Sequence, residues 1–291
     1  MPLFNSDFLT RLEYLSLVSK KVFRGQMMAQ RRTTAVGSGV EFADHRQYYP
    51  GDDFRYLDWN LFARHDELLL KRFQEEEDLH VYLLLDCSRS MAAGDTSKFD
   101  LARQVAAALA YIALADLDRV SVFAFADGLI DEFPLTRGKA RILSLMQFLE
   151  KLQPAGASTS LSELAAQFVH RSHRRGLAVV LSDLFDPDGF QRGIDLLRYH
   201  RYEPHIVQLS SRRDTNPLLL GDVELCDAET GEVRNLVITE KHQQAYQARF
   251  AAFLASLREY CSKYGIGCTI ADAEMPFDEL VLGMIRSTGS G

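Results

Sequence analysis

A short run of polar side chains follows an apolar stretch in the segment LLLDCSRSM, residues 83–91. Asp86, Ser88 and Ser90 stand at positions i, i+2 and i+4, so a turn can bring their oxygen atoms together. Carboxylate and hydroxyl oxygens are hard ligands that suit Mg²⁺ or Mn²⁺ better than zinc. The spacing therefore indicates a site for a divalent cation.

Further polar groups follow at comparable places in the chain. Asp183 ends a second apolar run, LAVVLSD, and a Gly-containing loop offers Ser158 and Thr159. Because ligands bind open parallel sheets outside the carboxyl ends of the strands, we expect these groups at the same sheet edge as Asp86. Magnesium prefers octahedral coordination and usually keeps waters, so these side chains are not expected to fill its shell. A vacancy for an oxygen from outside the chain is the consequence.

The strands that must position these groups are predicted from apolar runs that alternate with helical patterns. Buried strands are predicted at VYLLLD (81–86), RVSVFAF (119–125), LAVVLSD (177–183) and PHIVQL (204–209), and helices at 98–117, 139–152, 161–172 and 190–200. A repeated strand-then-helix order predicts a mostly parallel sheet with helices on both faces and right-handed crossovers. The segment LIDEFP (129–134) follows a short turn and is expected to be an antiparallel edge strand.

The last part of the chain interrupts this alternation. Two alternating runs around ETG, in residues 221–239, predict a β-hairpin. The remaining predicted elements are an amphipathic N-terminal helix, a helix at about 240–263, a strand at 266–272 and a helix at about 277–286. We therefore predict an N-terminal extension, residues 1–78, and an α/β domain, residues 79–291, with an inserted hairpin at about 212–240.

The composition is that of an ordinary globular protein. The 291 residues include 33 basic and 40 acidic side chains, for a net charge of −7, so we expect no nucleic-acid partner. The four cysteines form no CxxC pair, which argues against a zinc or redox motif and suits a cytoplasmic location. The longest apolar stretch, VAAALAYIALA, is too short to cross a bilayer, so no membrane insertion is expected.

The set formed by Asp86, Ser88, Ser90, Thr159 and Asp183 resembles the metal-ion-dependent adhesion site of von Willebrand factor A-type domains. The resemblance implies a Rossmann-like fold and a bound Mg²⁺, with Mn²⁺ as an alternative. It implies that Ser88, Ser90 and Thr159 touch the metal, that the two aspartates act directly or through water, and that a partner's carboxylate completes the shell. The family loop more often has paired glycines before its Thr. Here GAS stands in that place, which makes Ser158 an alternative ligand.

Two other stretches resemble a bacterial family known as domain of unknown function 58. They are EFADHRQYYPGDDFRYLDWNLFARHDELLLKRFQEEED (41–78) and GDVELCDAETGE (221–232). Members of that family are often encoded beside MoxR-type AAA+ ATPases and are thought to act with them. Many members carry transmembrane helices before the signature. No such helix is expected in this chain, so it resembles the soluble subgroup. The implied partner is a MoxR-type ATPase or the substrate protein of that ATPase.

Structural explanations compete with the functional ones. The aspartate and serines at residues 86–90 also suit a capped helix start, because Ser and Asp are favoured at N-caps. The charged stretch from Arg46 to Arg64 indicates either a docking surface beside the metal edge or a clasp of ion pairs that pins the N-terminal segment onto the sheet, and the clasp is the favoured interpretation. His170 and His173 lie in a basic helix end, where a solvated face is favoured over a metal pair.

No known enzyme motif accompanies the cation pattern. The chain lacks GxSxG, GxxxxGK[ST] and HExxH. The nearest enzymatic reading is a Mg²⁺-dependent phosphatase with Asp86 as nucleophile, but haloacid-dehalogenase-like enzymes carry a second Asp where this chain has Ser88. A scaffold with a vestigial metal site and a membrane-associated adaptor are also compatible with the pattern. We predict a non-enzymatic, divalent-cation-dependent protein-binding module.

Overall fold

The computed structural model describes residues 3–16, 32–35, 41–76, 79–93, 97–156, 158–172, 174–217 and 220–287. The contacts divide the chain into two compact units, residues 20–79 and residues 1–19 together with 80–291. The first 19 residues thus group with the larger unit. The division at residues 78 and 79 that the sequence suggests stays a prediction about domains.

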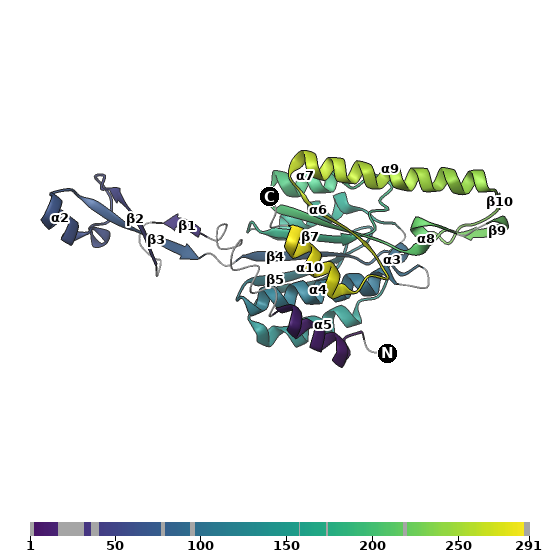
Figure 1. Ribbon diagram of the computed structural model, residues 1–291, viewed down its shortest axis with the longest axis horizontal. Helices are drawn as coiled ribbons and strands as arrows, with labels where there is room; N and C mark the ends of the chain where they lie inside the picture. Colours follow the sequence, from purple (N-terminus) through teal and green to yellow (C-terminus); the bar gives the residue numbers. More distant parts are fainter. Residues whose placement is uncertain are drawn as a thin grey trace. The chain divides into compact units, whose positions relative to one another are not determined.

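A six-stranded sheet forms the centre of the larger unit (Figure 1). The strand order is β11-β8-β7-β4-β5-β6, in which β6 alone runs antiparallel to its neighbour. The strands are β4 (His80–Asp86), β5 (Arg119–Phe125), β6 (Leu129–Arg137), β7 (Leu177–Ser182), β8 (Glu203–Ser210) and β11 (Gly267–Asp272). The Rossmann-like α/β fold expected for a von Willebrand A-type domain is confirmed, as is the antiparallel edge strand.

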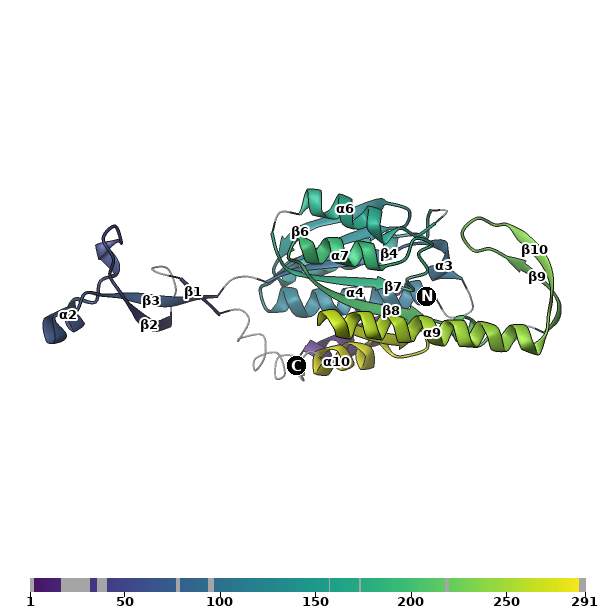
Figure 2. The same cartoon turned by 90° about the horizontal axis from the view of Figure 1, so that it is seen from above.

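Helices cover both faces of this sheet (Figure 2). One face carries a helix over residues 6–16, α4 (Lys98–Ala115), η2 (Lys139–Arg141), α5 (Ile142–Lys151) and α10 (Phe277–Ser287). The other face carries α6 (Leu161–Arg171), α7 (Gln191–Tyr199) and α9 (Glu240–Tyr264). Because both faces are covered, every residue of β4 is buried, which explains why this strand is a continuous apolar run.

The side chains of β4 alternate between the two layers, as the period of a strand requires. Tyr82 and Leu84 belong to the core beneath α6 and α7. The ring of Tyr82 meets the ring of Phe168 of α6 edge to face, with centroids 5.0 Å apart, and Phe123 of β5 also meets the Phe168 ring, at 4.9 Å. Such aromatic contacts add to the stabilisation from burial alone. The strand end that carries Asp86 therefore rests on a rigid core.

The inserted hairpin is confirmed. It consists of β9 (Gly221–Cys226) and β10 (Val233–Ile238), between α8 (Arg212–Thr215) and α9. In Figure 2 the hairpin arches from the end of α9 back toward α3 (Arg89–Ala92). Its tip therefore lies beside the segment in which the sequence predicts the cation site.

The smaller unit contains a three-stranded antiparallel sheet in the order β1-β3-β2. Its elements are β1 (Arg32–Ala35), β2 (Glu41–Gln47), η1 (Phe54–Tyr56), α2 (Trp59–His65) and β3 (Leu69–Glu76). Asp58 caps α2 and also contacts His45 at 3.1 Å and Lys71 at 3.4 Å. Arg46 pairs with Asp52 at 2.7 Å. These pairs join residues of the smaller unit to one another, so the predicted clasp onto the central sheet and the predicted docking role both stay predictions.

The close approach of α6 and α7 depends on Gly193. A Cβ atom on this residue would lie 2.7 Å from the carbonyl oxygen of Leu161, the first residue of α6. We expect Gly193→Ala to lower the free energy of unfolding by about 1–3 kcal/mol, because the helices must separate to admit the methyl group. Gly283→Ala in α10, where a Cβ meets nothing within 4 Å, is the control and is expected to cause no loss. Urea unfolding followed by circular dichroism measures both, and equal stabilities would contradict the role of Gly193.

Candidate metal centre

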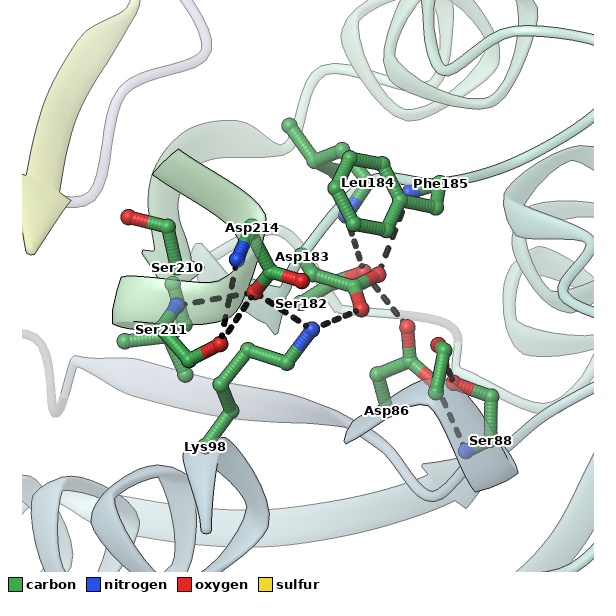
Figure 3. Close-up of polar contacts among 12 residues, drawn as sticks. Asp86, Ser88, Lys98, Ser182, Asp183, Leu184, Phe185, Ser210, Ser211 and Asp214 are labelled. Carbon is green, nitrogen blue, oxygen red and sulfur yellow. Dashed lines mark hydrogen bonds and ion pairs between the residues drawn. The ribbon is translucent and has the colours of Figure 1, made fainter. Parts of the chain in front are cut away.

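The two predicted aspartates lie at neighbouring strand ends. Asp86 is the last residue of β4, and Asp183 directly follows β7, which pairs with β4 in parallel. Neither residue has any exposed surface. The hydroxyl of Ser182 donates a hydrogen bond to Asp86 Oδ2, which ties the two strand ends together (Figure 3). The structure therefore brings both carboxylates to the same edge of the sheet, as the sequence predicts.

The turn after β4 gathers the hydroxyls around Asp86. The backbone N–H of Ser88 donates to Asp86 Oδ1 at 2.8 Å, which closes the turn. The Oγ atoms of Ser88 and Ser90 are 3.0 Å apart. Ser88 is fully buried and Ser90 is half-buried, so the pair lies at the boundary between core and solvent. Three of the five predicted ligands are thus neighbours in space.

Thr159 lies in the loop between α5 and α6, which hydrogen bonds fix at both ends. On one side Ala155 N donates to the carbonyl of Cys87 at 2.7 Å, within the Asp86 turn. On the other side Leu161 N donates to Asp186 Oδ2 at 2.8 Å, in the loop that follows Asp183. The loop therefore lies between the two aspartate segments. This is where a ligand from the loop is expected.

The hydroxyl of Thr159 is a buried polar group with an unfulfilled hydrogen-bonding capacity. Thr159 is 3% exposed, and its Oγ1 has no hydrogen-bond partner among the described residues. A buried hydroxyl without a partner costs roughly 1–3 kcal/mol, so such atoms usually have a function or a missing ligand. Ser158, the alternative ligand, is half-buried instead. The contacts therefore favour Thr159 over Ser158 as the cation-binding residue of this loop.

The nearby carboxylate of Asp183 disfavours the ionised form of Asp86. Burial raises the pKa of Asp86 to about 7, and the nearby charge of Asp183 contributes to that rise, against the hydrogen bonds from Ser182 and Ser88. A positive charge close to Asp86 would favour its ionised form. The arrangement of oxygen atoms and the electrostatics of Asp86 both suit a cation.

A lysine that the sequence analysis did not single out lies next to this pair. Lys98, the first residue of α4, places its Nζ 2.8 Å from Asp183 Oδ2 and 3.0 Å from Asp214 Oδ2 (Figure 3). Burial opposes the charged form, but the two carboxylates outweigh it and raise the pKa of Lys98 above its usual value. The ammonium group is therefore charged. The sequence does contain a signal for Lys98. It is a Lys at the first position of an apolar helix, where the helix dipole disfavours a cation.

The ammonium group of Lys98 serves the Asp183 side of the site. Asp183 Oδ2 accepts from Lys98, while Asp183 Oδ1 accepts from the backbone N–H of Phe185 at 3.1 Å. Asp86, Ser88 and Ser90 make no contact of this kind with Lys98 among the contacts that the structure describes. The residues present therefore fit a divalent cation on the Asp86 side. Both oxygens of Asp183 and both oxygens of Asp86 already accept hydrogen bonds, which favours contact through water for the two carboxylates alike.

A second residue that the sequence analysis did not single out comes from the hairpin. Glu229 at its tip contacts the backbone N–H groups of Arg89 and Ser90, inside the predicted cation-binding turn. The ETG pattern places Glu229 at the predicted turn of the hairpin, but nothing in the local sequence indicates what the side chain contacts. Its position depends on a contact between segments that are far apart along the chain.

The predicted alternative of a His170–His173 metal pair falls partly outside the described residues, because His173 is not among them. His170 is exposed on the last turn of α6. Within the described ranges, no group of three or more His, Cys, Asp or Glu side chains could hold a metal ion. A site built largely from hydroxyl oxygens, as at Asp86, is not of that type.

Lys98 makes a testable contribution to stability. We expect Lys98→Met to lower the free energy of unfolding by about 3–5 kcal/mol, because it leaves Asp183 buried beside Asp86 without a counter-charge. Lys151→Met removes an exposed Lys from the end of α5 and is expected to change stability by less than about 0.5 kcal/mol. Chemical denaturation of the two variants and the wild type measures this difference. A Lys98→Met protein as stable as the wild type would show that the buried charge needs no partner.

A model of the family described as "Protein of unknown function DUF58" matches residues 44–259 of this chain. Among curated relatives, Uncharacterized protein Mb1516 of Mycobacterium bovis is 26% identical over 250 residues, which cover 84% of this chain and 78% of the relative. Uncharacterized protein Rv1480 of Mycobacterium tuberculosis matches with the same identity and coverage. The family resemblance seen in the sequence is confirmed, and neither relative carries an assigned activity.

Two solved structures are similar to this chain at low scores. One is the conserved hypothetical protein BatB from Bacteroides thetaiotaomicron, with a TM-score of 0.46, 14% identity, and coverage of 73% of this chain and 100% of the other. The second is an aerotolerance-related membrane protein from Bacteroides fragilis, with a TM-score of 0.44, 16% identity and the same coverage. No helix in the described part of the present chain is long and apolar enough to cross a membrane.

Proposed function

The chain belongs to the family described as "Protein of unknown function DUF58", and we propose that it is a non-enzymatic protein-binding module that depends on a divalent cation. The observation that carries the proposal is the gathering of buried oxygen ligands around Asp86, together with the unpartnered hydroxyl of Thr159. A cation at this point would satisfy the hydroxyl and favour the ionised form of Asp86.

Ser88, Ser90 and Thr159 would touch the cation, which we propose to be Mg²⁺, with Mn²⁺ as a substitute. Asp86 and Asp183 would act directly or through water, and water is the simpler route for both, since every oxygen of the two carboxylates already accepts a hydrogen bond. The bound cation would supply a coordination position that an acidic side chain of another protein can fill. The chain's own hydrogen bonds, from Ser182 and from the Ser88 backbone, hold the Asp86 carboxylate in place for this purpose.

The proposed partner is a MoxR-type AAA+ ATPase or the substrate protein of that ATPase, and the proposed location is the cytoplasm. The family resemblance supplies the partner. The site supplies the chemistry, which is recognition of a carboxylate. A partner that binds only the cation-loaded form would couple its own binding to any change of conformation, because a ligand shifts an equilibrium by its differential affinity.

The phosphatase alternative fits the site poorly. A nucleophilic carboxylate must reach its substrate, but Asp86 is fully buried and both of its oxygens accept hydrogen bonds within the chain. Ser88 occupies the position where an acid or base would be needed. One observation favours the scaffold alternative. The ammonium group of Lys98 already pairs with the Asp183 carboxylate, so this carboxylate has a counter-charge without a metal ion. Partner capture distinguishes a scaffold from a cation-dependent module.

Thr159 gives a test with effects of opposite sign. We expect Thr159→Val to raise the stability of the metal-free protein by about 1 kcal/mol, because it removes a buried hydroxyl that has no partner. The same substitution should weaken Mn²⁺ binding by about tenfold or more, since it removes a ligand. Urea unfolding in EDTA and a Mn²⁺ titration followed by electron paramagnetic resonance measure the two effects. Ser158→Ala is the control, and a loss of Mn²⁺ affinity in that variant alone would identify Ser158 as the ligand.

Partner capture tests the function itself. Wild-type protein and Asp86→Ala are used as bait in bacterial lysate, in Mg²⁺ and in EDTA, and the retained proteins are identified by mass spectrometry. We expect an AAA+ ATPase or its substrate to be retained only by wild type in Mg²⁺. Asp131→Ala, on the exposed face of β6, controls for the loss of a charge. The same partners in every lane would support the scaffold and contradict the cation-dependent module.

A further inference from the structure

The tip of the inserted hairpin places a carboxylate on the predicted cation-binding turn. Glu229 Oε1 accepts a hydrogen bond from Ser90 N at 2.8 Å, and Glu229 Oε2 accepts from Arg89 N at 3.3 Å. The Arg89 guanidinium donates in return to the Glu229 carbonyl oxygen at 3.3 Å. These contacts join the hairpin to the residues that directly follow Ser88. An acidic side chain of the chain itself thus lies on the backbone of the turn beside which the proposed function requires a partner's carboxylate.

We propose that Glu229 is an intramolecular substitute for the partner's carboxylate, which a partner must displace in order to bind. The inference rests on the proposed function and adds to it the chemistry of the ligand. The ligand would be a Glu or Asp presented from a tight turn, so that its carboxylate reaches the Ser90 N–H and the cation together. The hairpin would then control access to the site.

The tip of the hairpin is built to present this side chain. Asp227 Oδ1 accepts from the backbone N–H groups of Glu229 at 2.9 Å and Thr230 at 2.8 Å. Gly231 N donates to the Asp227 carbonyl at 2.9 Å, and Gly231 has a φ of +72°, a conformation that favours glycine. The turn is thus ordered by its own hydrogen bonds before it meets the site. A carboxylate held in this way loses little conformational freedom on binding.

The body of the hairpin is only weakly anchored. In the described part of the chain β9 and β10 pair with each other alone, and no residue of either strand is buried. Val233, Leu236 and Val237 of β10 are each about half exposed or more, so little apolar surface holds the hairpin in place. Segments with few buried contacts open at low free-energy cost. The Glu229 contact can therefore be exchanged for a partner without unfolding the sheet.

A bound cation would favour the closed position of the hairpin, in which Glu229 contacts the turn. A cation beside the hydroxyls of Ser88 and Ser90 would attract the carboxylate of Glu229, so the cation-loaded site would hold the hairpin more firmly. If the closed form outnumbers the open form by about ten to one, the apparent affinity for an outside carboxylate falls about tenfold. Removal of the Glu229 carboxylate should therefore raise the apparent affinity for an outside carboxylate about tenfold.

A peptide with the hairpin's own turn tests the inference. The probe is a fluorescently labelled peptide of residues 225–233 with Cys226→Ser, and a second peptide carries Glu229→Gln in addition. Fluorescence anisotropy in Mg²⁺ compares three full-length proteins, the wild type, Glu229→Ala and Glu224→Ala. Glu224 is an exposed acid on β9 of the same hairpin, so its substitution removes the same charge away from the site. We expect the Glu peptide to bind Glu229→Ala about tenfold or more tightly than it binds the other two proteins. The Gln peptide should not bind Glu229→Ala, and EDTA should abolish the binding of the Glu peptide.

The failure of the inference and the failure of the proposed function give different results. Equal, EDTA-sensitive binding of the Glu peptide to all three proteins would preserve the cation-dependent site and overturn the role of Glu229. Absence of binding to Glu229→Ala would also overturn the inference. A Mn²⁺ titration of the same protein, with Asp86→Ala as its reference, then shows whether the cation site itself has failed.

Hydrogen exchange gives a second readout that needs neither peptide nor metal. The Ser90 amide should exchange faster in Glu229→Ala than in the wild type, because its acceptor is lost, and Glu224→Ala should leave the rate unchanged. Exchange in β4 reports whether the core remains intact. An unchanged Ser90 rate in Glu229→Ala would show that the hairpin does not hold the turn.

Discussion

Burial of two carboxylates at adjacent strand ends is the constraint on which the site depends. Asp86 and Asp183 have no exposed surface, and β4 and β7 are direct neighbours, so burial and the nearby charge of Asp183 both raise the pKa of Asp86. The ammonium group of Lys98 stabilises Asp183, and hydrogen bonds from the Ser182 hydroxyl and the Ser88 N–H stabilise Asp86. Asp214 also forms an ion pair with Lys98, so this ammonium group serves two carboxylates, and no ion pair between Asp86 and a base is among the described contacts. A cation beside Asp86 would favour its ionised form.

The same ion-pair network reaches the base of the inserted hairpin. Asp214 belongs to α8, and α8 leads directly into β9. Its carboxylate also accepts hydrogen bonds from the backbone and side chain of Ser211, which fixes α8 against the end of β8. The hairpin is thus tied to the site at two points, through Lys98 and Asp214 at its base and through Glu229 at its tip. The insertion therefore belongs to the surroundings of the proposed cation and is more than a decoration of the fold.

The elements that the sequence predicts are those whose signals are local. The buried strands, the edge strand, the hairpin and the turn after Asp86 all follow from patterns within about ten residues. The two contacts that change the interpretation of the site are not local. Lys98 meets Asp183 across 85 residues, and Glu229 meets Ser90 across 139 residues. The unfulfilled hydroxyl of Thr159 also becomes visible only when its surroundings are known.

An internal carboxylate changes what a partner must supply. A group tethered within the same chain acts at an effective concentration of the order of millimolar, so a single Asp or Glu from another protein starts at a disadvantage. The partner's acid can replace Glu229 only if the partner gains further contacts that the hairpin does not make. Isolated acidic side chains, which are abundant on every protein surface, are thereby rejected. The weak anchoring of the hairpin keeps that threshold low enough for a specific partner to cross.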